Sequence, residues 1–141
     1  MSILQRVVVP VATEEDAEVT CAALNPYLDE VEMVIGVHVI EKAGGGIDKA
    51  PLEKREEDAA AILELAESTL RDTVAVETRV AYGTSVAETL FDEAAEANAT
   101  ALAFCPRGGN RFVQILAGDT ASKLVTSPRL PVVSLPEPED G

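Results

Sequence analysis

The residues with the clearest chemistry lie in the glycine-rich stretch CPRGGNRFVQILAGDT, at positions 105–120. Gly108 and Gly109 have no side chains, so they permit positive φ angles and let backbone N–H groups approach an anion closely. Gly118 follows at the predicted start of a short helix, whose free N–H groups also favour an anion. Together these two elements predict a site that could hold a polyphosphate.

The charges of this part of the chain support the same hypothesis. Between residues 97 and 136 the bases are Arg107, Arg111, Lys123 and Arg129, whereas Asp119 is the only acid, in a chain whose formal net charge is −14. Two alternatives remain open. A buried strand or subunit interface would also lose its acids, and a site for an acidic partner protein would also need bases.

Asp119 argues against phosphate binding. A hydroxyl at this position could donate a hydrogen bond to phosphate, whereas a carboxylate can only accept one and repels the phosphate. Asp119 is equally well suited to be the N-cap of the short helix. A bound metal could reconcile Asp119 with phosphate, but no second acidic ligand lies near it in the sequence.

Cysteine and histidine add little further chemistry. Cys21 and Cys105 fit neither a metal spacing nor a disulfide framework, so we expect two buried thiols. A redox role for Cys105 beside Arg107 is the less favoured alternative. His38, the single histidine, is expected to lie in the core or against a helix. We predict no metal site, no catalytic residue and no enzymatic activity; a slow ATPase is the remaining alternative, for which we find no positioned base.

The glycine stretch must be held by the elements around it, and these alternate between strands and helices. Apolar and β-branched runs predict strands at residues 6–12, 31–40, 74–83, 100–105 and 130–136. Helices are predicted at 14–28 with Thr13 as N-cap, at 51–72, at 84–99 with Thr84 or Ser85 as N-cap and Glu88 in a capping box, and at 118–127. This alternation predicts one α/β domain over residues 1–141, with a parallel sheet, helices on both faces and a frayed tail at 136–141.

Composition restricts the class of protein. A chain of 141 residues, 47% hydrophobic and 26% charged, can bury one globular core. It has no apolar stretch of about 18 residues or more, and its start is poor as a signal peptide, so we expect a cytoplasmic protein without membrane insertion. The acidic excess argues against nucleic acid and anionic membrane as partners. It favours a salt-rich cytosol, as in a halophile, over an ordinary acidic protein.

In parallel sheets of this kind, ligands bind beyond the carboxyl ends of the strands, where the strand order reverses. The ends of the first and fourth predicted strands, Ala12-Thr13 and Cys105-Pro106, should therefore form a crevice. The glycine stretch begins at this crevice.

The chain resembles the universal stress protein family. The matching pieces are VVVPVATEEDAE at the first strand, VAYGTSVAETLFDEAAEANATALAFC through the third and fourth strands, the glycine stretch, and the closing SPRLPVVSL. The resemblance implies an adenine nucleotide alpha hydrolase-like fold, with a five-stranded parallel sheet of order 3-2-1-4-5. It also implies a homodimer through the last strand, here residues 130–135.

The ATP-binding members of this family carry an aspartate at the end of strand one and a pattern of glycine, two residues, glycine, nine residues, glycine, then serine or threonine. Gly108 and Gly118 keep this spacing, but three positions depart from the pattern. Cys105 replaces the first glycine, Asp119 replaces the hydroxyl with Thr120 one place later, and Ala12 replaces the aspartate. The candidate nucleotide contacts that the resemblance implies are Pro10, Val11, Ala12, Val39, Phe104, Cys105, Arg107, Gly108, Gly109, Asn110, Arg111, Gly118, Asp119 and Thr120.

Two hypotheses for the function follow. The first is a homodimeric stress-response or regulatory protein with a degenerate nucleotide loop, which does not bind ATP tightly and works through an unidentified protein partner. The second is a regulatory module that binds ATP, another nucleotide or another phosphorylated anion through Arg107–Arg111 and Gly118. Arg107 and Arg111 could then supply the phosphate contacts that Cys105 and Asp119 cannot.

Overall fold

The structure is a computed structural model, and it describes residues 3–41, 52–106 and 118–138. Its elements are β1 (Arg6–Pro10), α1 (Glu14–Leu24), the 3-10 helix η1 (Asn25–Glu30), β2 (Met33–Glu41), α2 (Leu52–Leu70), β3 (Ala75–Gly83), α3 (Val86–Glu96), β4 (Ala101–Phe104), α4 (Gly118–Thr126) and β5 (Val132–Ser134). The strands form a five-stranded parallel sheet in the order β3-β2-β1-β4-β5. The predicted α/β architecture and strand order are confirmed.

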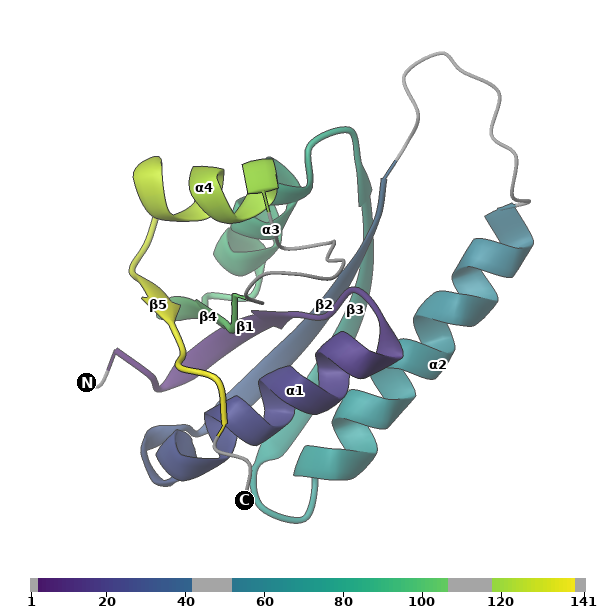
Figure 1. The fold of residues 1–141 in the computed structure, drawn as a ribbon. Helices are drawn as coiled ribbons and strands as arrows, with labels where there is room; N and C mark the ends of the chain where they lie inside the picture. Colours follow the sequence, from purple (N-terminus) through teal and green to yellow (C-terminus); the bar gives the residue numbers. More distant parts are fainter. Residues whose placement is uncertain (1–2, 42–51, 107–117, 139–141) are drawn as a thin grey trace.

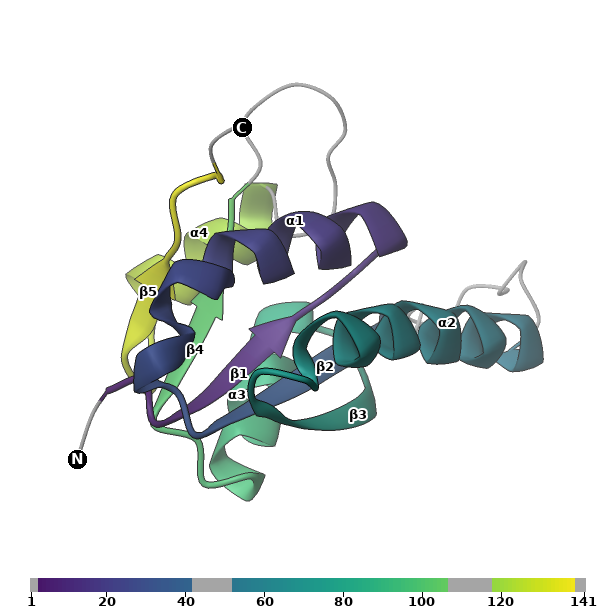
Figure 2. The same ribbon diagram turned by 90° about the horizontal axis from the view of Figure 1, so that it is seen from below.

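Helices cover both faces of the sheet, α1 and α2 on one face and α3 and α4 on the other (Figures 1 and 2). The central strand β1 shows how the sequence produces this arrangement. Val7 and Val9 pack into the core beneath α1 and α2, whereas Val8 packs into the core beneath α3 and α4. Both faces of a central parallel strand are buried, and this is why β1 is a continuous apolar run rather than an alternating one.

Several elements are shorter than the sequence predicts, and proline explains the difference in two of them. The first helix, predicted over residues 14–28, ends at Leu24 and continues as η1, which has Pro26 in its first turn. Pro26 has no N–H to donate, so the regular helical ladder does not continue through it. The last strand, predicted over residues 130–136, pairs with β4 only from Val132 to Ser134. Pro131 and Pro136 flank it and cannot donate ladder hydrogen bonds.

The helix caps follow the sequence in two cases and differ in a third. The Oγ1 of Thr13 accepts a hydrogen bond from the Asp16 N–H at 3.0 Å, as predicted for an N-cap. Ser85, rather than Thr84, caps α3 by accepting from the Glu88 N–H at 3.3 Å. The helix α4 already begins at Gly118, which places Asp119 inside its first turn. The prediction that Asp119 is the N-cap is therefore wrong.

Candidate functional site

The carboxyl end of β1 is held by backbone hydrogen bonds. Beyond Pro10, the last residue of β1, the N–H of Val11 donates to the carbonyl of Val37 in β2 at 3.0 Å. The N–H of the next residue, Ala12, donates to Oδ2 of Asp16 at 2.8 Å. The backbone at the end of β1 thus has its partners within the protein before any ligand is present.

Asp16 is a buried carboxylate that the sequence reasoning did not single out. It is 5% exposed, lies in the first turn of α1, and accepts a hydrogen bond from the Thr20 hydroxyl at 3.4 Å as well as from the Ala12 N–H. Because Thr13 caps the Asp16 N–H in return, the two side chains form a reciprocal cap similar to a capping box. The spacing Thr-x-x-Asp was the sequence signal that could have identified it.

His38 lies on β2 next to the end of β1. Its Nδ1 is 2.8 Å from the carbonyl oxygen of Val11. A carbonyl only accepts, so Nδ1 carries a proton and donates. His38 is half-buried and lines a pocket, so the core alternative of its expected position is wrong, whereas the alternative of a position against a helix is not contradicted. The cause is its place near the carboxyl end of β2, at the pocket between the start of α1 and the first half of α2.

This pocket has a volume of about 610 Å³, which is within the range of small-molecule sites. Its walls are Ala12–Glu14 at the start of α1, His38–Glu41 at the end of β2, and Arg55, Asp58, Ala61 and Ile62 of α2. The sequence predicted a crevice between the ends of β1 and β4, whereas this pocket lies on the β2 side of β1. Residues 107–117, which follow β4, are outside the described part of the chain.

Among the residues that the structure describes, the charged side chains around the pocket are mostly acidic. Glu14, Glu41 and Asp58 line it together with one arginine, Arg55. The Nη2 of Arg55 donates to the backbone carbonyl of Glu41 at 2.6 Å, which ties α2 to the end of β2. Asp58 forms an exposed ion pair with Lys54 at 3.0 Å. Within the described part of the walls, a polyanion in this pocket would therefore meet more repulsion than attraction.

The predicted contact residues fall into four groups. Ala12 and Val39 line the pocket. The second group is buried at the strand ends and consists of Pro10, Val11, Phe104 and Cys105. Thr120 is half-exposed in α4, whose first residue is Gly118. Outside the described residues lie Arg107, Gly108, Gly109, Asn110 and Arg111, and the side chain of Asp119.

Both cysteines are buried thiols, as the sequence predicted. Burial, and then the nearby Asp16 carboxylate, raise the pKa of Cys21 to about 11, so this thiol is protonated at neutral pH. Within the described ranges, no group of three or more His, Cys, Asp and Glu side chains could hold a metal ion. In the same ranges, none of the helices has the length and apolar character to cross a membrane.

Known structures share this fold at low sequence identity. A protein from the universal stress protein family from Burkholderia pseudomallei is 23% identical with a TM-score of 0.67, over 96% of this chain and 98% of that one. The universal stress protein from Archaeoglobus fulgidus in complex with dAMP is 20% identical with a TM-score of 0.61, over 95% and 99%. A universal stress protein family protein from Arabidopsis thaliana with AMP bound is 15% identical with a TM-score of 0.63, over 94% and 92%.

These identities are low enough that the structural likeness establishes the fold alone. No curated protein matches the chain. The sequence profile of the universal stress protein family, however, matches residues 4–136, which is almost the whole chain. This protein therefore belongs to the universal stress protein family.

Proposed function

We propose that this protein is a homodimeric stress-response regulator that binds ATP only weakly and acts in the cytoplasm through contacts with a partner protein. The end of β1 carries the proposal. A methyl group stands at Ala12, where ATP-binding members have a carboxylate. The carboxylate of Asp16, four residues later, is 5% exposed and accepts the Ala12 N–H, so it is turned to the backbone rather than to a ligand.

The charges of the pocket support weak ATP binding. A ribose hydroxyl placed near Ala12 would lose the charge-assisted hydrogen bond that an aspartate offers. The acids Glu14 and Glu41 would repel a triphosphate near the pocket, and the guanidinium of Arg55 already donates to a backbone carbonyl.

The alternative is a regulatory module that binds a nucleotide or another phosphorylated anion through Arg107–Arg111 and Gly118. Two observations favour it: a pocket of about 610 Å³ persists beside Ala12 and Val39, and the relatives from A. fulgidus and A. thaliana hold dAMP and AMP. In this alternative the arginines would replace the phosphate contacts that a hydroxyl at Asp119 would have made.

Calorimetric titration with ATP at high KCl tests the proposal. We expect no saturable binding at micromolar ATP, and micromolar affinity would refute weak binding. The alternative predicts that a nucleotide raises the melting temperature, since a ligand at a hundredfold excess over its Kd stabilises the fold by about 2.7 kcal/mol. If no nucleotide does so, and Arg107→Ala changes nothing, the alternative is wrong.

The homodimer is proposed through residues 130–135. Its physical support is the position of β5 at one edge of the sheet, where Val132 and Val133 remain half-buried in the single chain. Light scattering should give a dimer, and Val133→Lys should shift it towards the monomer. Val76→Lys is the matched control, because Val76 and Val133 both pack against the same core from opposite edges of the sheet. A wild-type monomer at all salt concentrations would overturn the dimer.

A further inference from the structure

Strand β3 forms the edge of the sheet opposite to β5. It pairs with β2 without a bulge from Met33↔Ala75 to Glu41↔Gly83, and it contains no proline. In the part of the chain that the structure describes, no backbone hydrogen bond joins its outer side to another segment. A regular edge of this length presents N–H and C=O groups that can pair with a further strand.

Exposed apolar side chains lie along this edge. Val80 is 38% and Tyr82 is 42% exposed, and positions two apart in a strand share one face. This is the face beneath α2, since the Tyr82 hydroxyl donates to the Glu56 carboxylate at 2.5 Å. Leu52, one turn before Glu56 on the same side of α2, is 52% exposed. Leu52, Val80 and Tyr82 together form a strip of exposed apolar side chains.

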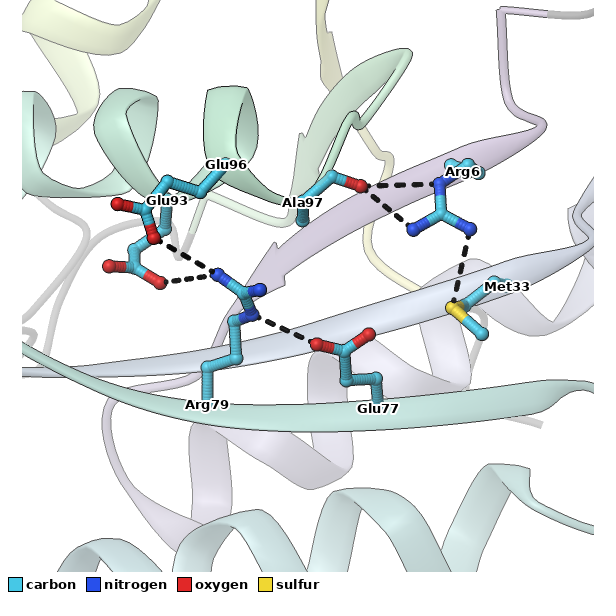
Figure 3. Close-up of polar contacts among 7 residues, drawn as sticks. All are labelled: Arg6, Met33, Glu77, Arg79, Glu93, Glu96 and Ala97. Carbon is cyan, nitrogen blue, oxygen red and sulfur yellow. Dashed lines mark hydrogen bonds and ion pairs between the residues drawn. The ribbon is translucent and has the colours of Figure 1, made fainter.

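The opposite face of β3 is acidic. Figure 3 shows Arg79 between three carboxylates: Glu77 at 2.9 Å, Glu93 at 3.0 Å and Glu96 at 3.7 Å. Three carboxylates against one guanidinium leave two negative charges. The side chains of Glu77 and Glu96 are 38% and 70% exposed, so they can reach a further group at the edge.

We propose that the β3 edge binds an extended basic segment of a partner protein, which joins the sheet as an additional strand. Alternate side chains of an added strand point to the two faces of the sheet. The segment that fits has apolar residues on one face, against Val80 and Tyr82, and lysine or arginine on the other, near Glu77 and Glu96. The inference rests on the proposed function for the existence of a partner, and it names the chemistry of that partner.

The charge of the protein favours such a partner over a second copy of the chain. The net charge is −14, and two β3 edges side by side would bring the excess carboxylates of both copies together. A dimer through β5 leaves this edge accessible, because β3 and β5 lie at opposite ends of the sheet. The dimer and the partner would therefore not compete.

A synthetic peptide of alternating valine and lysine tests the proposal on the full-length protein. Fluorescence anisotropy should show saturable binding that weakens as KCl rises, because the charges that contribute lie at the surface. Hydrogen exchange should show new protection of the amides of residues 75–83. A peptide of the same composition with its lysines and valines in two separate blocks controls for charge attraction alone. Equal binding of the blocked peptide would overturn the proposal.

Variants locate the site. Val80→Lys should weaken binding of the alternating peptide about tenfold, which corresponds to about 1.4 kcal/mol. Val125→Lys is the matched control, because Val125 is 50% exposed on α4, away from β3. Glu96→Gln should also weaken binding while leaving the fold intact, and circular dichroism checks each variant.

The proposal is wrong if Val125→Lys weakens binding as much as Val80→Lys. It is also wrong if Val80→Lys dissociates a dimer, since a second copy would then occupy the edge. Val80 does not line the pocket, so Val80→Lys should leave the affinity for ATP unchanged. An ATP titration of this variant therefore separates the peptide result from the hypothesis of weak ATP binding.

Discussion

Ala12→Asp is the substitution that tests most directly why ATP binding should be weak. Ala12 lines the pocket at the end of β1, and its backbone is already fixed by the hydrogen bond from its N–H to Asp16 at 2.8 Å. An aspartate there would restore an acceptor for a ribose hydroxyl without rebuilding the backbone. We therefore expect the substitution to raise ATP affinity, although it adds a negative charge to an acidic protein.

The size of the gain follows from two opposing effects. A hydrogen bond to a charged group contributes about 1.5–3 kcal/mol, which corresponds to about 10- to 150-fold in Kd. Repulsion from Asp16 and Glu14 amounts to about 1 kcal/mol at close distance in water. This repulsion is present in the free protein as well as in the ATP complex. It therefore lowers the free energy of unfolding more than it lowers the affinity for ATP. We expect at least about tenfold tighter ATP binding and a melting temperature lower by about 4 °C.

Calorimetry with ATP on the wild type and on two variants is the measurement. Ala61→Asp is the matched control, because it adds the same carboxylate to the same pocket from the α2 wall. It should leave ATP binding unchanged or weaker. If Ala12→Asp changes the Kd less than about twofold, which is about 0.4 kcal/mol, the missing carboxylate does not explain weak binding and the reasoning fails.

Three further predictions concern stability. Asp16→Ala leaves the part-buried N–H of Ala12 without its acceptor and should lower the unfolding free energy by about 1–3 kcal/mol in urea titrations, whereas Asp16→Asn keeps an acceptor and should lose less. Cys21 has a pKa raised from 9.0 to about 11 in the folded protein, so its contribution to stability is full below pH 9.0 and is lost as pH rises to about 11. Stability measured across this range should fall less steeply for Cys21→Ala, and equal slopes would contradict the prediction. Finally, the net charge of −14 predicts that the thermal midpoint rises with KCl up to molar concentrations; a flat curve would argue against a halophilic protein.

Much of the fold was predictable because it depends on local patterns. Continuous β-branched runs such as Arg6–Pro10 are typical of strands buried on both faces, and the caps Thr13 and Ser85 mark helix starts that the structure confirms. The errors were also local. Pro26 ended the regular helix earlier than its apolar pattern indicated, and Asp119, expected as the N-cap of α4, lies inside its first turn.

The candidate site was only partly predictable. Ala12 and Val39 were predicted and line the pocket, but the wall from α2, including Arg55 and Asp58, was missed. Arg55 is more than forty positions from Ala12 in the printed sequence, and nothing local connects the two. The crossover from β2 back over the sheet places α2 beside α1, and only this packing makes the pocket.

The sequence by itself determined the family, the order of strands and helices, the acidic charge and the absence of a carboxylate at Ala12. These are properties of residue type and of spacing along the chain, so they need no three-dimensional information. Only the tertiary structure decided that His38 lines a pocket rather than lying in the core, and that Arg79 gathers three carboxylates beside an open edge. Each of these depends on which distant segments the parallel register brings within hydrogen-bonding distance, and that choice is made by the packing of the whole core.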